Sequence, residues 1–148
     1  MRALVPSLRS SRRLLAALAL CVATANASAE LVVVVSSRSQ VESIDADQVA
    51  AIFLGHASRL KDGTQVVAID QQLGAPQRDS FYRTLTGKTP ALLKAHWSKM
   101  VFTGRGQPPR EANGDAGVRR LVADNPALIG YIERDALDAS VRAVLVLP

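Results

Sequence analysis

The stretch VVAIDQQLGAPQRDSFYR, residues 66–83, decides how this chain is expected to fold. Its apolar start has the composition of a short buried strand. Pro76 suits the first position of a helix, which needs no backbone donor, and Gly87 is placed to end that helix. Phe81 and Leu85 are four residues apart and would share one helical face. The stretch therefore predicts a strand, a tight turn and a helix.

The junction between this strand and this helix is a candidate anion-binding site. The start of a helix leaves backbone N–H groups unpaired, and the helix dipole favours a negative charge there. Arg78 adds a full positive charge and several donors, although an ion pair with Asp70 or Asp79 would be the alternative use of its side chain. Ser80 would offer a hydroxyl group to the same anion, unless it bonds back within the helix.

Further polar side chains follow two of the predicted strands. Gln71 and Gln72 come directly after the strand just described, where their alternative role is ordinary turn polarity. Ser36, Ser37 and Arg38 follow an earlier strand. Because open α/β sheets bind ligands at the carboxyl ends of their strands, we expect these five residues to meet the candidate anion site at one edge of the sheet.

The first 29 residues predict a secretory signal peptide. Four arginines precede an apolar run over residues 14–23, and the small residues 27–29 form a cleavage pattern. The run is shorter than the roughly 20 residues that span a bilayer, so a retained membrane anchor is the weaker alternative. Removal would leave residues 30–148, with 14 basic residues, 13 acidic residues and no cysteine. This predicts a periplasmic protein of one domain, whose near-neutral charge does not favour nucleic-acid binding.

The predicted domain, residues 30–148, alternates strands with helices. Its opening β-branched run indicates a strand buried on both faces, which favours a parallel sheet. The predicted strands are residues 31–35, 66–69, 128–132 and 141–147, and the predicted helices are residues 48–54, 76–86, 90–100 and 116–123. The fold class predicted from this order is α/β, with a single open, mostly parallel sheet flanked by helices.

The residue pattern gives little support for a catalytic site or a metal site. No nucleophile, base and orienting group occur at a recognisable spacing, so we predict a protein that is not an enzyme. His56 has no second ligand at metal spacing, so neither a metal nor a cofactor is predicted. Residues 78–110 hold seven basic residues and one acidic residue, which indicates a positive face for an anionic partner or an ordinary solvated surface.

Several short motifs, taken in order, resemble the phosphate-type substrate-binding proteins of ABC transporters, which have a type II periplasmic-binding-protein fold. No single motif is specific, but the ordered set extends over nearly all of the predicted domain. The motifs are Val49–Gly55, Asp62–Gly63, the strand ending at Asp70–Gln71, Arg78–Phe81, Trp97, Phe102–Gly104, Pro108–Pro109 and Ile129–Tyr131.

The resemblance implies a role in solute binding and transport. Members of that family have two lobes with the ligand between them, and this chain resembles the second lobe alone. The family usually binds phosphate there with an arginine and a Ser-Gly-Thr turn that opens a helix, whereas the matching residues 74–80 keep the helix start without the hydroxyl-bearing turn. The expected partners are inorganic phosphate or a related oxyanion, a membrane transporter, and a second lobe or dimer partner. A ligand-free interaction or assembly module of the cell envelope, built on the same lobe, is the alternative.

Overall fold

The computed structural model of the protein describes residues 29–148. The predicted signal peptide, residues 1–29, lies outside the described residues except for its last position. Among the described residues, no helix is both long enough and apolar enough to cross a bilayer.

Five strands form one mixed, open sheet in the order β3-β2-β4-β1-β5. Both β2–β3 and β2–β4 are parallel pairs, whereas β1 runs antiparallel to both of its neighbours, β4 and β5. The predicted fold class is confirmed, since four of the five strands point the same way. The strands are β1 (Leu31–Ser36), β2 (Val67–Gln71), β3 (Arg110–Ala112), β4 (Leu128–Glu133) and β5 (Val141–Val146).

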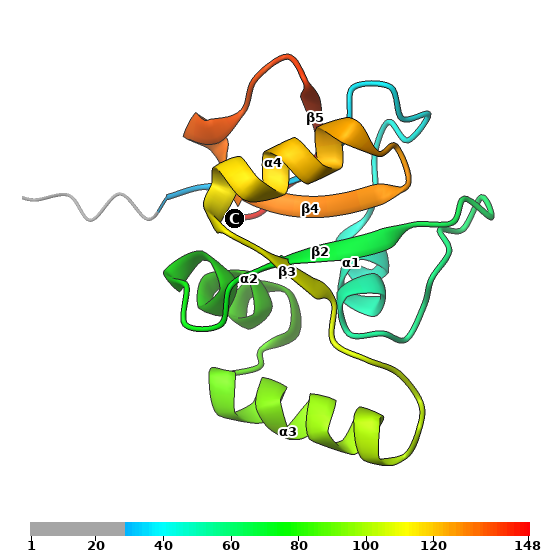
Figure 1. Ribbon diagram of the computed structural model, residues 1–148, viewed down its shortest axis with the longest axis vertical. Coiled ribbons are helices and arrows are strands. Elements are labelled where there is room, and N and C mark those ends of the chain that lie inside the picture. The colour runs from blue at the N-terminus through cyan, green and yellow to red at the C-terminus, as the bar shows by residue number, and fades with distance from the viewer. Residues whose placement is uncertain (1–28) are drawn as a thin grey trace, which may run out of the picture.

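Four helices cover the two faces of this sheet (Figure 1). Helix α4 packs on β4, β1 and β2 from one side, while α1 and α2 lie on the other side, with α3 beyond them at the lower end of the molecule. The helices are α1 (Ala46–Phe53), α2 (Pro76–Thr86), α3 (Pro90–Phe102) and α4 (Gly114–Asp124). The four predicted helices and four predicted strands are all present, and β3 is an additional strand over residues for which no element was predicted.

Local chemistry accounts for where the helices begin and end. The side chain of Asp45 accepts a hydrogen bond from the backbone of Gln48 and so caps α1. Pro76 occupies the first turn of α2, and Gly87 ends this helix with a φ of 68°, a left-handed conformation that costs glycine little. These signals are local in sequence, which is why the helix boundaries were predictable.

Strand β1 separates the two hydrophobic cores of the domain. Val33 and Val35 face the core shared with α1, α2 and α3, whereas Val32 and Val34 face the core beneath α4. This alternation confirms that β1 is buried on both faces. Among the described residues, the two cores extend from Leu31 to Leu147 and so draw on nearly the whole length of the domain.

Candidate functional site

The candidate anion site at the end of β2 is built around one buried carboxylate. Asp70 accepts hydrogen bonds from the hydroxyl of Tyr82 at 2.7 Å, from the hydroxyl of Tyr131, and from the backbone N–H of Gln71 at 2.8 Å. The Nε of Arg78 lies 3.2 Å from its Oδ2 atom. A carboxylate that leaves water needs such partners, because burial without them is costly.

Arg78 is therefore paired with Asp70, which is one of the two ion pairs that the sequence offered as the alternative use of its side chain. Its guanidinium carbon also lies 5.3 Å from the ring centre of Tyr82, and the residue is only 6% exposed. The bond to Asp70 uses Nε alone. Within residues 29–148, the two terminal nitrogens of Arg78 make no hydrogen bond. The side chain is thus fixed in place while its outer donors remain available.

Electrostatics inside this cluster follow from burial and from the pairing of charges. Burial raises the pKa of Asp70 above its usual range, although the hydrogen bonds from Tyr131 and Tyr82 and the charge of Arg78 act in the opposite direction. Burial acts to lower the pKa of Arg78, but the nearby charge of Asp70 raises it overall. Burial, together with the charge of Asp70, also raises the pKa of both tyrosines, so both remain hydroxyl donors at neutral pH.

The backbone amides at the start of α2 are less available than expected. The N–H groups of Arg78 and Asp79 both donate to the carbonyl oxygen of Ala75, at 3.0 and 3.2 Å. Ala75, the residue that caps α2, makes no side-chain hydrogen bond to the helix. The expectation of several unpaired amides at this corner is therefore wrong for these two positions, and the guanidinium of Arg78 is the stronger donor there.

Gln71 points into the protein and connects β2 to the start of α4. Its side-chain amide donates to Oδ1 of Asp115 at 2.7 Å and to the carbonyl oxygen of Tyr131 at 3.2 Å. The other oxygen of Asp115 accepts the backbone N–H of Glu133 at 3.3 Å. The first turn of α4 thus already carries a carboxylate from the chain itself, which suits the positive end of the helix.

Gln72 and Ser80 remain accessible near the corner. Gln72 is exposed and Ser80 is partly exposed, and their side chains make no hydrogen bond within the described part of the chain. Ser80 lines a small pocket of 150 Å³ beside Pro76, Gln77 and Glu133. The carboxylate of Glu133 accepts a hydrogen bond from Gln77 at 3.2 Å, so the pocket has one acidic wall.

Ser36, Ser37 and Arg38 lie at the opposite edge of the sheet, so the expected meeting of these residues with the corner is wrong. Because β1 is antiparallel to β4, its carboxyl end lies beside the amino ends of the other strands (Figure 1). Ser36 and Arg38 instead bind the last turn of α4, donating to the carbonyl oxygen of Ala123 at 3.1 Å in both cases. A central strand is apolar on both faces in either direction, so its composition could not reveal this reversal.

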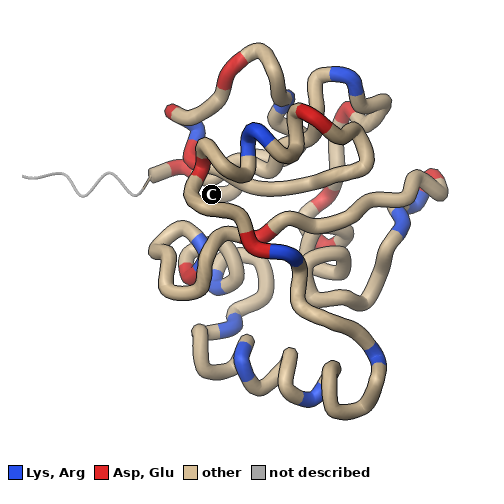
Figure 2. The backbone as a smooth tube through the Cα atoms, in the orientation of Figure 1, with Lys and Arg blue, Asp and Glu red and all other residues tan. Residues whose placement is uncertain are grey.

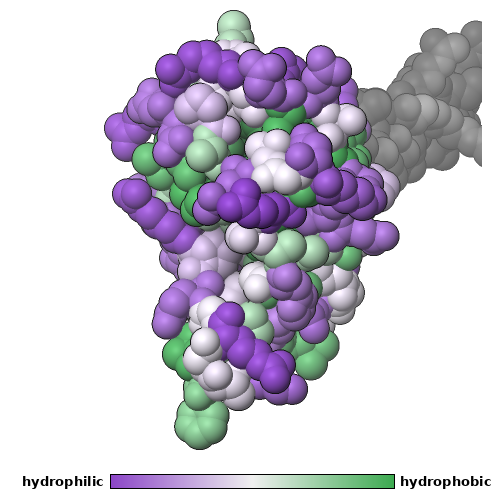
Figure 3. Space-filling model, turned by 90° about the vertical axis from the view of Figure 1, so that its right-hand side faces the viewer, coloured by the Kyte–Doolittle hydropathy of each residue, from purple (hydrophilic) through white to green (hydrophobic). Residues whose placement is uncertain are grey.

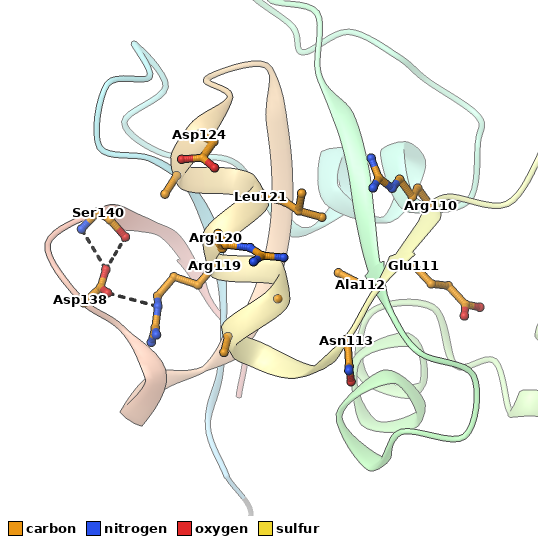
Figure 4. A pocket seen from close by; sticks show the side chains of 13 residues that line it. Arg110, Glu111, Ala112, Asn113, Arg119, Arg120, Leu121, Asp124, Asp138 and Ser140 are labelled. Carbon is orange, nitrogen blue, oxygen red and sulfur yellow. Dashed lines mark hydrogen bonds and ion pairs between the residues drawn. The ribbon is translucent and has the colours of Figure 1, made fainter.

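A groove on the far side of α4 contains none of the predicted site residues. It measures 750 Å³ and lies between β3, α4 and the segment around Ser140 (Figure 4). Three arginines and three acidic residues line it, so its charges balance. Arg119 is already paired with Asp138 at 3.1 Å. This groove therefore shows no preference for an anion.

The structure also brings together two histidines that are far apart in the sequence. The rings of His56 and His96 are 5.4 Å apart, and Nε2 of His96 lies 2.9 Å from the carbonyl oxygen of Leu54. Among residues 29–148, no group of three or more His, Cys, Asp or Glu side chains is placed to hold a metal ion. That the protein binds no metal ion remains a prediction.

Sequence reasoning missed three residues of the Asp70 cluster: Tyr82, Tyr131 and Asp115. Tyr82 lies four residues after Arg78 and shares its helical face, so a local signal existed for that residue. Tyr131 comes from a neighbouring strand and Asp115 from a distant helix, and only the folded domain brings Tyr131 to Asp70 and Asp115 to Gln71.

Comparison with known proteins confirms the predicted resemblance at the level of the fold. Neither a protein-family model nor a curated protein matches the sequence. A phosphate ABC transporter substrate-binding protein from Clostridium perfringens, solved with bound phosphate, matches 78% of this chain and 44% of its own length, with a TM-score of 0.62 and 21% identity.

Two further solved structures match the chain over the same share of its length. An ABC-type phosphate transport receptor from Vibrio cholerae matches with a TM-score of 0.61 and 18% identity. PstS from Borrelia burgdorferi matches with a TM-score of 0.58 and 15% identity. Each match again covers 78% of this chain, but only 45% and 46% of those proteins. The chain thus has the fold of part of a substrate-binding protein and spans less than half the length of these structures.

Proposed function

We propose that this protein is a secreted, periplasmic solute-binding protein that holds phosphate or a similar oxyanion at the corner between β2 and α2, in a system linked to ABC transport. The role is one of binding rather than catalysis. One observation carries the proposal: Arg78 is nine-tenths buried and anchored through Nε, and its two terminal nitrogens make no hydrogen bond within residues 29–148. Paired donors in a fixed geometry suit an oxyanion.

The remaining contacts would come from other polar groups of the corner. Gln72 offers an amide that is free of hydrogen bonds to the described residues. Ser80 also offers a free hydroxyl group, from a different face of α2 than Arg78 and beside the pocket that Glu133 lines. Ser36, Ser37 and Arg38 lie on the far edge and would not contribute to this site, and Gln71 would act by orienting the cluster around Asp70. The named neighbours of known structure are phosphate-transport proteins, which supports the choice of oxyanion.

A single lobe would bind such an anion weakly. The corner provides one wall, and a small anion left partly in water retains the hydration that competes with protein donors. The chain spans less than half the length of its structural neighbours. A second lobe, a dimer partner or a membrane transporter would therefore supply the opposing wall.

Thermal unfolding with added anions tests this proposal. We expect phosphate or sulfate at about 20 mM to raise the melting temperature by a few degrees, since a ligand at tenfold its Kd adds about 1.4 kcal/mol to the free energy of unfolding. Chloride at equal ionic strength is the salt control. Arg78→Lys should abolish the shift, because lysine keeps the charge but loses the planar donors.

Arg83→Met is the matched control variant, because Arg83 is an exposed arginine on the same helix. It should retain the phosphate shift in full. If folded wild-type protein shows no shift with either oxyanion, or if Arg83→Met removes it as completely as Arg78→Lys, the proposal is wrong.

A ligand-free interaction module of the cell envelope is the second candidate function. The observation that favours it is that Asp115 already occupies the start of α4 and that Gln71 is turned inward to bind it. It predicts a stable domain that is indifferent to oxyanions, with a protein partner recovered by cross-linking in the periplasm. A phosphate shift that depends on Arg78 would exclude it.

A further inference from the structure

The described domain has a strong separation of charge. Residues 80–110 contain six basic and no acidic residues, whereas the remaining described residues contain eight basic and thirteen acidic ones. Figure 2 shows basic but no acidic positions along α3 and the loop that follows it, at the lower end of the molecule. The lower end itself, α3 with its flanking loops over residues 88–105, holds four basic and no acidic residues, and this charge attracts an anionic partner over a distance.

The outer face of α3 is also apolar. Leu93, Trp97 and Met100 attach the helix to the rest of the domain. On the outside, Phe102 is 93% exposed and Leu92 is 55% exposed. Hydrophobic side chains likewise stand out at the lower end of the molecule in Figure 3. Isolated exposed apolar residues are common, but here they share one protruding helix with the positive charge.

Helical spacing places these apolar and basic side chains on one surface. With 3.6 residues per turn, Phe102 lies opposite the buried stripe of α3, directly above Ala95. Lys99 and Leu92 flank it on one side, and Lys94 lies on the other. This outward surface therefore presents an exposed aromatic side chain together with lysines on both sides of it, so a positive charge and an apolar group face the same way.

We propose that this face of α3 docks on the anionic surface of a phospholipid bilayer. The lysines would lie among the anionic headgroups, and Phe102 and Leu92 would enter the boundary with the acyl chains. Lysine is depleted in protein–protein interfaces but abundant on membrane-binding surfaces, which favours lipid over an acidic protein. Helix α3 lies at the lower end of the molecule, so its outer face is not covered by other described elements (Figure 1). This inference is independent of the anion site at Arg78.

Vesicle co-sedimentation tests the proposal with residues 30–148, the chain that remains after removal of the predicted signal peptide. The vesicles are phosphatidylcholine alone or phosphatidylcholine with about a third phosphatidylglycerol. We expect the protein to sediment only with the anionic vesicles and to be released by high salt. Lys94→Glu with Lys99→Glu should weaken the partitioning at least about tenfold. Phe102→Ser should weaken it several-fold without loss of the fold, because this side chain is almost fully exposed.

Arg59→Glu with Arg120→Glu is the matched control, because it makes the same change in net charge at exposed positions outside α3. It should leave vesicle binding largely intact. Three results would overturn the proposal: no sedimentation of folded wild-type protein with anionic vesicles at low salt, equal losses in the two double variants, or binding to acidic polypeptide but not to vesicles. Salt-sensitive self-association without lipid, abolished by Lys94→Glu with Lys99→Glu, would instead assign this face to a second copy.

Discussion

At the scale of single residues, Asp70 and Asp45 show how the surroundings of a carboxylate decide the direction of its pKa shift. Asp70 is buried, and desolvation raises its pKa although several donors surround it. Asp45 is exposed, and its bonds to Lys61 and to Gln48 lower its pKa to about 2. The first residue orients a guanidinium, whereas the second fixes the start of α1.

The lowered pKa of Asp45 predicts how the stability of the folded protein depends on pH. A lowered pKa in the folded state means that the charged carboxylate stabilises the fold above pH 3.8, and that this contribution is lost as the pH falls through about 2. We expect Asp45→Asn to have a lower melting temperature than wild type at pH 7, with a difference that narrows progressively below pH 4. Circular dichroism during thermal unfolding, repeated at each pH, measures this difference in melting temperature.

Asp47→Asn is the control for that experiment, because Asp47 lies in the same helical turn but does not cap α1. It should change the melting temperature much less at pH 7. A constant difference between wild type and Asp45→Asn from pH 7 to pH 2.5 would mean that charge at this position contributes nothing.

At the scale of elements, the packing of α4 on the sheet depends on one glycine of β4. A Cβ atom at Gly130 would lie 2.5 Å from Cγ1 of Val118 and 3.2 Å from Cγ2 of Val122. Both valines belong to the inner face of α4 and are fully buried. The absence of a side chain at Gly130 therefore sets how closely the helix approaches the strand, which explains the glycine in the Ile129–Tyr131 motif.

We predict opposite effects on stability from two glycine substitutions at this contact. Gly130→Ala should lower the free energy of unfolding by about 1–3 kcal/mol, because the added methyl group overpacks the core. Gly117→Ala, within α4 itself, meets its nearest neighbours at an ordinary 3.7 Å and should raise it by about 0.5–1 kcal/mol. Urea unfolding of both variants tests the pair, and a loss of equal size in both would contradict it.

At the scale of the whole molecule, the two cores are joined through a shared sheet. Alternate residues of β1 belong to opposite cores, and β4 contributes Tyr131 to one and Ile132 to the other. Neither core can open without exposing the other side of the same strands. The domain should therefore behave as one cooperative unit.

This predicts that different probes of unfolding report the same transition. Trp97 is the single tryptophan and lies on α3, in the core shared with α1 and α2, so its fluorescence reports on that side alone. Its urea curve should coincide with the curve from far-ultraviolet circular dichroism, which reports on all helices and strands. An earlier fluorescence transition would mean that α3 detaches before the sheet unfolds.

Local signals in the sequence determined most elements of this fold and part of the candidate site. The caps, the proline and glycine positions and the hydrophobic spacing act over a few residues, so the helices and strands followed from them, whereas the anion site at Arg78 and Ser80 stays a prediction. Tertiary structure alone decided the direction of β1, which places Ser36 and Arg38 at the far edge, and the joining of Asp70 to Tyr131. The reason is physical: a strand at the centre of a sheet is apolar on both faces whichever way it runs, and hydrogen bonds between distant residues leave no trace in local composition.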